Sequence, residues 1–366
     1  MGWRGFDAGT REDRLPAMAD RQGRAMAPQG DRVLVTGAAG FIARHVVRAL
    51  LEAGYAVRGT VRSKDVMERV SAAIEGQGTS CERLDFVLAD LTEDGGWETA
   101  VSGCRFVVHT ASPFPASVPK DRFALVAVAR GGTARVIGAA MRAGVERVVM
   151  TSSVAAIYYG HSPDPSRVFS AADHSNVHAA AISAYAVSKT MAEAAAWEML
   201  EGSATELVSI NPALVLGPIL GRSVGTSARL VQMMMSGRLP LVPDVSFGLV
   251  DVRDVADAHV RALAVPAAAG QRFILSAGSR SLREIAAVIA SAQPAYRWKL
   301  PRATLPDWVV RAAALAVPAA AQLLPELGPP KLLDARPAQE ILDVAFRSPE
   351  AAIAAMAASL IAHGAA

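Results

Sequence analysis

A tyrosine and a lysine stand four residues apart, at positions 185 and 189. Side chains at positions i and i+4 share one face of a helix, so a helix here places the Lys189 ammonium beside the Tyr185 phenol. A neighbouring cation lowers the pKa of a phenol from its usual value of about 10, which prepares the phenol for proton transfer at neutral pH. The spacing predicts that Tyr185 is a general acid assisted by Lys189.

Hydroxyl side chains stand at the end of a predicted strand upstream of this pair. The apolar run 147–151 is typical of a buried strand, and Ser152 and Ser153 follow it directly. Because open α/β folds bind ligands at the carboxyl ends of parallel strands, a hydroxyl at this place can contact a bound substrate. We expect Ser153 to hold the substrate oxygen that Tyr185 protonates. Ser153, Tyr185 and Lys189 are the predicted catalytic residues.

A glycine-rich turn near the N-terminus indicates a dinucleotide site. The predicted strand 32–36 runs into the sequence Thr36-Gly37-Ala38-Ala39-Gly40-Phe41-Ile42-Ala43. Glycines there permit a tight turn and let backbone N–H groups approach a pyrophosphate, whose charge a helix N-terminus stabilises. An amphipathic helix over 42–53 and a second strand over 55–61 follow, which favours this interpretation over an ordinary strand–helix turn. Ala43 replaces the third glycine but is still small enough for close helix–strand packing.

The end of the second predicted strand bears on the choice of dinucleotide. An NAD site has a carboxylate there for the ribose hydroxyls, whereas this chain has Arg62, Ser63 and Lys64 before its next acid, Asp65. Arg62 can pair with a 2′-phosphate. The sequence therefore favours NADP(H), with NAD(H) left open and a solvated basic loop as the alternative interpretation.

Asp90 and Leu91 follow the third predicted strand, at 84–88. A short carboxylate at this place can accept a hydrogen bond from the adenine amino group. Capping of the next helix is the alternative role for Asp90.

Strands and helices alternate along most of the chain. We expect strands at 32–36, 55–61, 84–88, 105–109, 147–151 and 206–211, and helices at 42–53, 123–143 and 184–200. Crossovers of this length predict an α/β fold, a doubly wound parallel Rossmann sheet with a smaller, mostly helical C-terminal substrate lobe. The predicted boundaries are a disordered tail over 1–29, an NADP-binding domain over 30–215, and a substrate-binding lobe over 216–247 and 279–366. Residues 248–278 are expected to return to the first domain, with strands at 249–252 and 273–275.

Composition excludes several other classes of protein. The 366 residues are 52% hydrophobic and 19% charged, which is enough apolar material for a core. Lys and Arg number 37 against 34 Asp and Glu, and the net charge of +3 gives no nucleic-acid-binding pattern. The apolar stretch 308–324 is broken by Arg311 and Pro318, and 351–362 is too short to cross a bilayer, so no membrane span is expected. Two cysteines and no secretory leader predict a cytoplasmic location.

Motifs in a consistent order resemble the extended short-chain dehydrogenase/reductase family, from about residue 31 onward. They lie at 40–45, 57–62, 109–114, 147–154, 185–189, 195–198, 211–218 and 250–256. Within this family, which includes the NAD-dependent epimerases and dehydratases, the chain is most similar to the dihydroflavonol-reductase-like branch. The likeness is greatest to fungal methylglyoxal/isovaleraldehyde reductases and bacterial aldehyde reductases.

The resemblance implies contacts at particular residues. Those expected to bind NADP(H) are Gly37, Ala38, Ala39, Gly40, Phe41, Ile42, Arg62, Asp90, Leu91, Tyr185, Lys189, Val215 and Ser227. The first six would contact the pyrophosphate, and Tyr185 and Lys189 the nicotinamide ribose. Phe114 would line the substrate pocket. The basic residue that the family has four positions after Arg62 is Val66 in this chain, a departure that weakens the case for NADP over NAD.

The expected activity is the NADPH-dependent reduction of an aldehyde or ketone, a small-molecule carbonyl substrate, to an alcohol. One alternative is a sugar-nucleotide epimerase or dehydratase, although dehydratases of this family have acidic residues where this chain has Val154 and Ala155. A 3β-hydroxysteroid dehydrogenase-like enzyme is a second, because the C-terminal lobe is apolar. A non-enzymatic NADP-binding sensor is a third, which the intact catalytic residues argue against.

Two further expectations concern metals and assembly. His161, His174 and His178 lie in a loop without the regular spacing of metal ligands, so no metal site is predicted. The oligomeric state is left open, a homodimer included.

Overall fold

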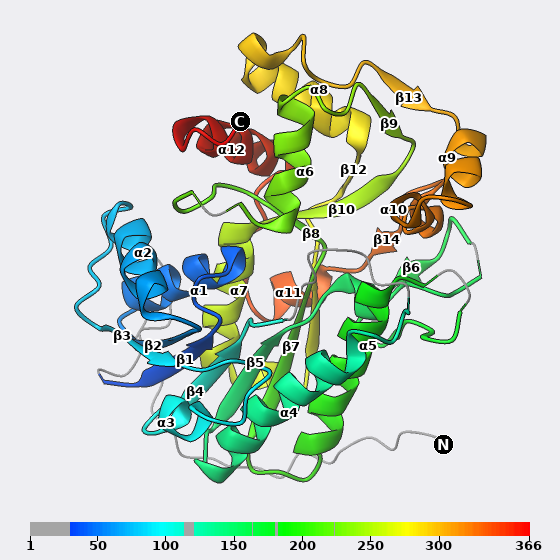
Figure 1. The fold of residues 1–366 in the computed structure, drawn as a ribbon. Coiled ribbons are helices and arrows are strands. Elements are labelled where there is room, and N and C mark those ends of the chain that lie inside the picture. The colour runs from blue at the N-terminus through cyan, green and yellow to red at the C-terminus, as the bar shows by residue number, and fades with distance from the viewer. Residues whose placement is uncertain (1–29, 113–120, 163, 180–181, 223) are drawn as a thin grey trace.

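The computed structural model describes residues 30–112, 121–162, 164–179, 182–222 and 224–366. Within these residues, seven parallel strands form one sheet in the order β11-β7-β5-β4-β1-β2-β3 (Figure 1). They are β1 Arg32–Thr36, β2 Ala56–Val61, β3 Leu84–Leu88, β4 Phe106–His109, β5 Arg147–Thr151, β7 Glu206–Pro212 and β11 Arg272–Leu275. The strand order reverses between β1 and β4, which confirms the predicted doubly wound Rossmann sheet.

Helices cover both faces of this sheet. Successive side chains of a strand point to opposite faces, so Val33 and Val35 of β1 face one layer and Leu34 the other. The first layer holds α1 Phe41–Glu52, α2 Lys64–Glu75 and α7 Val252–Ala264. The second holds α3 Trp97–Val101, α4 Val126–Arg142 and α5 Ala184–Leu200. Burial on both faces explains why the strands are continuous apolar runs.

A second, smaller sheet leads into the C-terminal lobe. Among the described residues, β8 Leu214–Leu216, β10 Ser246–Asp251 and β12 Ser279–Ser281 form a three-stranded sheet. The expectation that 249–252 returns to the main sheet is wrong, because Leu249 to Asp251 pair with β8 instead. The edge of β7 that such a strand would need is taken by β11, which contains residues 273–275.

The lobe has its own apolar core. The helices α6 Thr226–Met235, α8 Leu282–Ala292 and α12 Pro349–Ala362 pack around it at one end of the molecule (Figure 1). The remaining strands and α-helices of the described residues are β6 Val168–Phe169, β9 Leu241–Pro243, β13 Ala303–Leu305, α9 Asp307–Ala314, α10 Pro318–Ala321, β14 Leu332–Leu333 and α11 Arg336–Glu340. In the described part of the chain, every helix is too short or too polar to pass through a bilayer.

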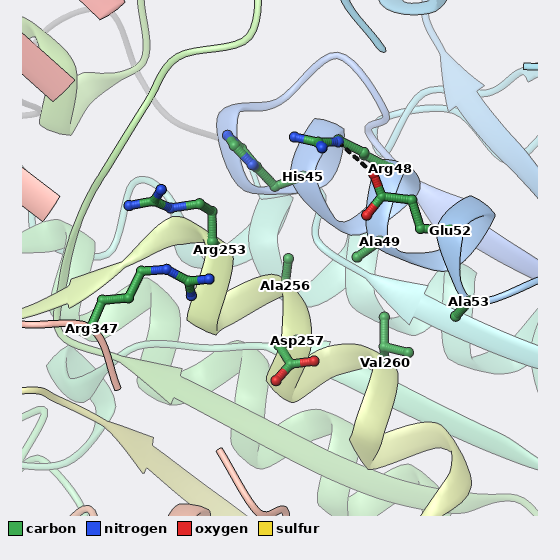
Figure 2. Close-up of a pocket in the computed structure, with 10 residues that line it drawn as sticks. All are labelled: His45, Arg48, Ala49, Glu52, Ala53, Arg253, Ala256, Asp257, Val260 and Arg347. Carbon is green, nitrogen blue, oxygen red and sulfur yellow. Dashed lines mark hydrogen bonds and ion pairs between the residues drawn. The ribbon is translucent and has the colours of Figure 1, made fainter. Parts of the chain in front are cut away.

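A polar groove of about 260 Å³ lies between α1 and α7. Figure 2 shows Arg48 and Glu52 of α1 and Arg253 of α7 along it. Arg253 pairs with Asp251 at 2.6 Å, and Arg347 pairs with Asp254 of α7. The Arg347–Asp254 pair attaches the segment before α12 to α7. The groove contains none of the predicted site residues.

Candidate active site

The helix that carries the tyrosine and the lysine begins at a defined place. Ser183 caps α5, because its side-chain oxygen accepts the N–H of Ala186 at 3.1 Å. Tyr185 is half-buried and hydrogen-bonds with Ser153. One turn further on, Lys189 Nζ donates to the carbonyl oxygen of Thr151, the last residue of β5, at 3.0 Å. The fold thus brings the three predicted catalytic residues together at the carboxyl end of β5.

Burial dominates the electrostatics of this group. Burial lowers the pKa of Lys189 from 10.5 to about 8, and the Glu193 carboxylate opposes that change. Burial also raises the pKa of Tyr185 above 10.0, and the hydrogen bond with Ser153 opposes this. The expected lowering of the Tyr185 pKa by Lys189 is not found among the described residues. Burial of the phenol is the largest cause of the Tyr185 shift, and the Lys189 charge is not among its causes.

A buried acid that the sequence analysis missed, Glu193, lies next to the catalytic candidates and hydrogen-bonds residues around them. Glu193, one turn after Lys189, pairs with Arg272 of β11 at 2.7 Å. It also accepts hydrogen bonds from Ser152 Oγ at 2.5 Å and Asn211 Nδ2 at 2.9 Å. Burial raises the pKa of Glu193, but the Arg272 charge and the hydrogen bonds from Arg272, Ser152 and Ser209 outweigh burial and lower it below 4.5. Its i+4 spacing from Lys189 is the sequence signal that could have revealed it.

The glycine-rich turn has the shape that an anion needs. Gly37 has φ of +65°, and a Cβ there would lie 3.0 Å from the Cβ of Ala111. Gly40 caps α1 without a side chain, and a Cβ there would lie 3.2 Å from the Gly37 carbonyl oxygen. The first N–H groups of a helix have no hydrogen-bond acceptor within the helix. At the start of α1 no capping side chain accepts them either. The turn therefore fits the pyrophosphate of a dinucleotide.

Gly59 of β2 is a residue whose role the sequence analysis did not single out. A Cβ on Gly59 would lie 2.8 Å from the Cβ of Ala38 and 3.0 Å from the Phe86 ring. The Ala38 N–H donates to the Thr60 carbonyl oxygen at 2.9 Å. The absence of a side chain at Gly59 lets the nucleotide turn pack directly on β2.

Arg62 and Asp90 follow neighbouring strands of the sheet. Arg62 is exposed, and its charge contributes to lowering the pKa of Asp90. The larger causes are hydrogen bonds from the N–H and the hydroxyl of Thr92 to Asp90 Oδ1, at 2.8 and 2.7 Å. Asp90 thus caps a turn rather than a helix. Leu91 packs on Gly132 of α4. A Cβ added to Gly132 would lie 2.9 Å from the Cβ of Leu91.

The two remaining cofactor candidates lie in the connection to the lobe. Val215 is buried in β8, paired with Val250. Ser227 is in the first turn of α6, a helix that begins beside α1, since a Cβ on Gly225 would lie 3.2 Å from the Cβ of Phe41. The contacts of these residues with a nucleotide remain predictions.

Two of the sequence-based expectations, the disordered tail over 1–29 and the substrate contact of Phe114, lie outside the described residues.

The loop before α6 is held by α1 itself. Arg44 Nη1 donates to the Leu220 carbonyl oxygen at 2.5 Å, and His45 Nε2 lies 2.8 Å from the Pro218 carbonyl oxygen. The helix that starts at the nucleotide turn is therefore attached to the lobe.

No three His, Cys, Asp or Glu side chains gather as metal ligands anywhere in the described ranges. Of the three histidines considered above, His161 lies against the Phe169 ring at 5.3 Å. His174 Nδ1 lies 3.1 Å from the Ala172 carbonyl oxygen.

A doubly wound sheet, a glycine-rich nucleotide turn and a Ser-Tyr-Lys group at the end of β5 define an NAD(P)-dependent oxidoreductase of the short-chain dehydrogenase/reductase type. The chain belongs to the NAD dependent epimerase/dehydratase family, whose model matches residues 33–278. Within that family it belongs to the dihydroflavonol-reductase-like branch, as its relatives indicate.

Two relatives and one solved structure illustrate the similarity. Cinnamoyl-CoA reductase CAD2 of Medicago truncatula is 38% identical over 256 residues, which are 67% of this chain and 76% of the relative. Tetraketide alpha-pyrone reductase 2 of Arabidopsis thaliana is 34% identical over 270 residues, covering 72% of this chain and 83% of that protein. Yeast methylglyoxal/isovaleraldehyde reductase Gre2, solved complexed with NADPH, is 28% identical with a TM-score of 0.75, covering 92% of this chain and 100% of that one.

Proposed function

We propose that this protein reduces an aldehyde or ketone to an alcohol with NADPH, and that Tyr185 is the proton donor. The observation that carries the proposal is the hydrogen-bonded pair of Ser153 and Tyr185 at the carboxyl end of β5, with Lys189 one turn along α5. The named activities of the relatives, all reductases, support the same reaction class.

The residues that would hold the cofactor are those around β1 and β2. Gly37, Gly40 and the N-terminus of α1 suit the pyrophosphate, and Arg62 suits the 2′-phosphate that distinguishes NADPH from NADH. Asp90 and Leu91 suit the adenine. When bound, NADPH supplies the hydride that reduces the carbonyl carbon.

The chain's own residues handle the carbonyl oxygen. The Ser153 hydroxyl hydrogen-bonds this oxygen and holds it beside Tyr185. Burial keeps the Tyr185 phenol protonated, so its proton is present when negative charge develops on the oxygen. The Lys189 ammonium has three donors, of which the Thr151 carbonyl takes one. The others can stabilise the tyrosinate that remains after proton transfer.

The test is a coupled binding and turnover experiment. NADPH absorbance is followed with a panel of aldehydes, ketones, flavanonols and cinnamoyl-CoA, and nucleotide affinity is measured by fluorescence titration. Tyr185→Phe removes only the phenolic oxygen, and we expect kcat to fall about 100-fold or more while Kd for NADPH stays unchanged. Tyr296→Phe, in the C-terminal lobe, is the matched control. Full turnover by Tyr185→Phe, or no NADPH oxidation with any carbonyl, would overturn the proposal.

A further inference from the structure

Three side chains of α5 contact the last residues of β5. Tyr185, Lys189 and Glu193 follow one another at intervals of four residues, so they share one face of the helix. Each of them hydrogen-bonds one residue of the segment 151–153, where β5 ends. The helix face that carries the proposed proton donor therefore also carries an acid, and that acid is only 3% exposed.

Asn211 connects this acid to Ser153. It lies in β7, the strand that pairs with β5 (Figure 1), and it is fully buried. Its Nδ2 donates to Glu193 Oε2 at 2.9 Å and to the Ser153 carbonyl oxygen at 3.2 Å. A side-chain amide has two N–H donors, so both hydrogen bonds form at once. Ser152 Oγ donates to the same Glu193 oxygen at 2.5 Å, which holds the residue before Ser153 as well.

These contacts determine where the Ser153 hydroxyl lies. Ser153 caps the 3-10 helix Val154–Ala156, and its Oγ accepts the Ala155 N–H at 3.1 Å. That hydrogen bond selects the χ1 angle of the serine, and the bond from Asn211 to its carbonyl oxygen holds the backbone. With both fixed, the hydroxyl stays within hydrogen-bond reach of Tyr185. A shift of the backbone here would move the hydroxyl away from the substrate oxygen.

The groups around Lys189 differ in charge. His109 of β4 and His259 of α7 are both buried, and burial lowers their pKa to about 3 and about 4. Both are therefore neutral at neutral pH, as is the Tyr185 phenol, whose pKa burial raises. The remaining charged side chains of α4, α7, β5 and β7 are in ion pairs of their own. Glu193 is the charged group that acts on Lys189, and its carboxylate opposes the effect of burial.

Arg272 keeps Glu193 ionised. It lies in β11 and pairs with the carboxylate at 2.7 Å. Burial raises the pKa of Glu193, but the Arg272 charge is the largest cause in the other direction, and the net result is a pKa below 4.5. Arg272 Nη1 is itself held by the carbonyl oxygens of Ala171 and Asp173. Glu193 is thus a fixed carboxylate at neutral pH, in contact with the end of β5 where the reaction takes place.

We propose that Glu193 is a positioning residue for the reaction, which holds the Ser153 hydroxyl at the substrate oxygen through Asn211. Its charge also stabilises the Lys189 ammonium. This inference rests on the proposed carbonyl reduction, in which the serine holds the oxygen and the ammonium stabilises the tyrosinate. Because Glu193 acts through these residues, its loss should change the rate of the chemical step and its pH dependence, and not the binding of NADPH.

A double-mutant cycle tests the positional part. Asn211→Leu keeps the size of the side chain but removes its hydrogen bonds to Glu193 and to the Ser153 carbonyl oxygen, and it leaves the ion pair with Arg272 in place. We expect kcat to fall about tenfold, with Kd for NADPH unchanged. In a Ser153→Ala background, where there is no hydroxyl to position, the same substitution should lower kcat less than about twofold. NADPH oxidation with the best carbonyl compound of the panel measures all four proteins.

The pH dependence of kcat tests the charge. The ammonium form of Lys189 is the active form, so the wild-type rate should fall as pH rises through the pKa of Lys189, about 8. Glu193→Gln keeps the size of the side chain and removes the charge that stabilises the ammonium, so this alkaline limb should move about one pH unit lower. Glu198→Gln, on the same helix with 73% of its side chain exposed, is the matched control and should leave the limb in place.

Each result supports or overturns the inference. An equal loss of kcat from Asn211→Leu with and without the Ser153 hydroxyl assigns Asn211 and Glu193 a purely structural role and overturns it. An alkaline limb that Glu193→Gln leaves unmoved overturns it as well. If Glu193→Gln fails to fold because Arg272 is left unpaired, the double-mutant cycle alone decides. All of these results leave the proposed function intact, because that function fails only when the wild type oxidises NADPH with no carbonyl compound at all.

Discussion

Lys189→Met should make the protein more stable at neutral pH while it removes activity. Lys189 is 7% exposed, and burial lowers its pKa from 10.5 to about 8. A change of this size corresponds to about 3 kcal/mol of unfavourable folding free energy while the ammonium is charged. Methionine has a similar length and no charge, although the lost hydrogen bond to Thr151 costs about 1 kcal/mol. The expected net gain at pH 7 is about 2 kcal/mol.

The gain should depend on pH in a definite direction. The pKa of Lys189 in the folded protein lies below its unfolded value, so the unfolded chain binds the additional proton between about pH 8 and 10.5. Wild-type stability should therefore rise with pH across that window, relative to the variant. The advantage of Lys189→Met should shrink above pH 8 and reverse near pH 10.5, where only the lost hydrogen bond remains.

Urea unfolding followed by circular dichroism, without nucleotide, measures both variants from pH 7 to 10.5. Lys64→Met, on the exposed start of α2, is the matched control and should show neither the gain nor its pH dependence. A variant that is less stable than the wild type at pH 7 would refute the reasoning. So would a stability difference that is the same at pH 7 and pH 10.

Two other substitutions test the nucleotide site. Arg62→Ala should raise Kd for NADPH about tenfold, because the 2′-phosphate loses its charge-assisted hydrogen bonds, and should leave Kd for NADH nearly unchanged. Fluorescence titrations measure both constants, and an equal effect on the two nucleotides would contradict this prediction. Gly59→Ala should destabilise the fold by about 1–3 kcal/mol and weaken NADPH binding, because its Cβ would lie 2.8 Å from that of Ala38. Gly95→Ala, with open space around the added carbon, is the control, and equal urea midpoints for both variants would count against close packing at Gly59.

Local patterns were sufficient to predict most strands of the main sheet and the helix that carries Tyr185 and Lys189. The apolar runs of the parallel strands and the cap at Ser183 are properties of neighbouring residues, and the predicted helix over 184–200 coincides with α5. The predicted helix over 123–143 begins later, at Val126, because the Asp121 side chain accepts the Phe123 N–H at 2.9 Å and holds a turn there.

Long-range pairs could not be predicted in this way. Glu193 and Arg272 are 79 residues apart, and Tyr158 and Glu326 are 168 apart. Neither pair is joined by periodicity or by a motif, and each exists only once the strands and the lobe are in place. The edge position of β11 beside β7 likewise depends on competition between strands, which no single segment reveals.

The attachment of α1 to the loop before α6 has a thermodynamic consequence. Arg44 and His45 hold backbone carbonyls of that loop, while the first turn of the same helix faces the nucleotide turn. A nucleotide that holds α1 in place should therefore also hold the start of the C-terminal lobe in place. Linkage requires reciprocity, so a substrate analogue that binds better after NADPH must tighten NADPH by the same factor.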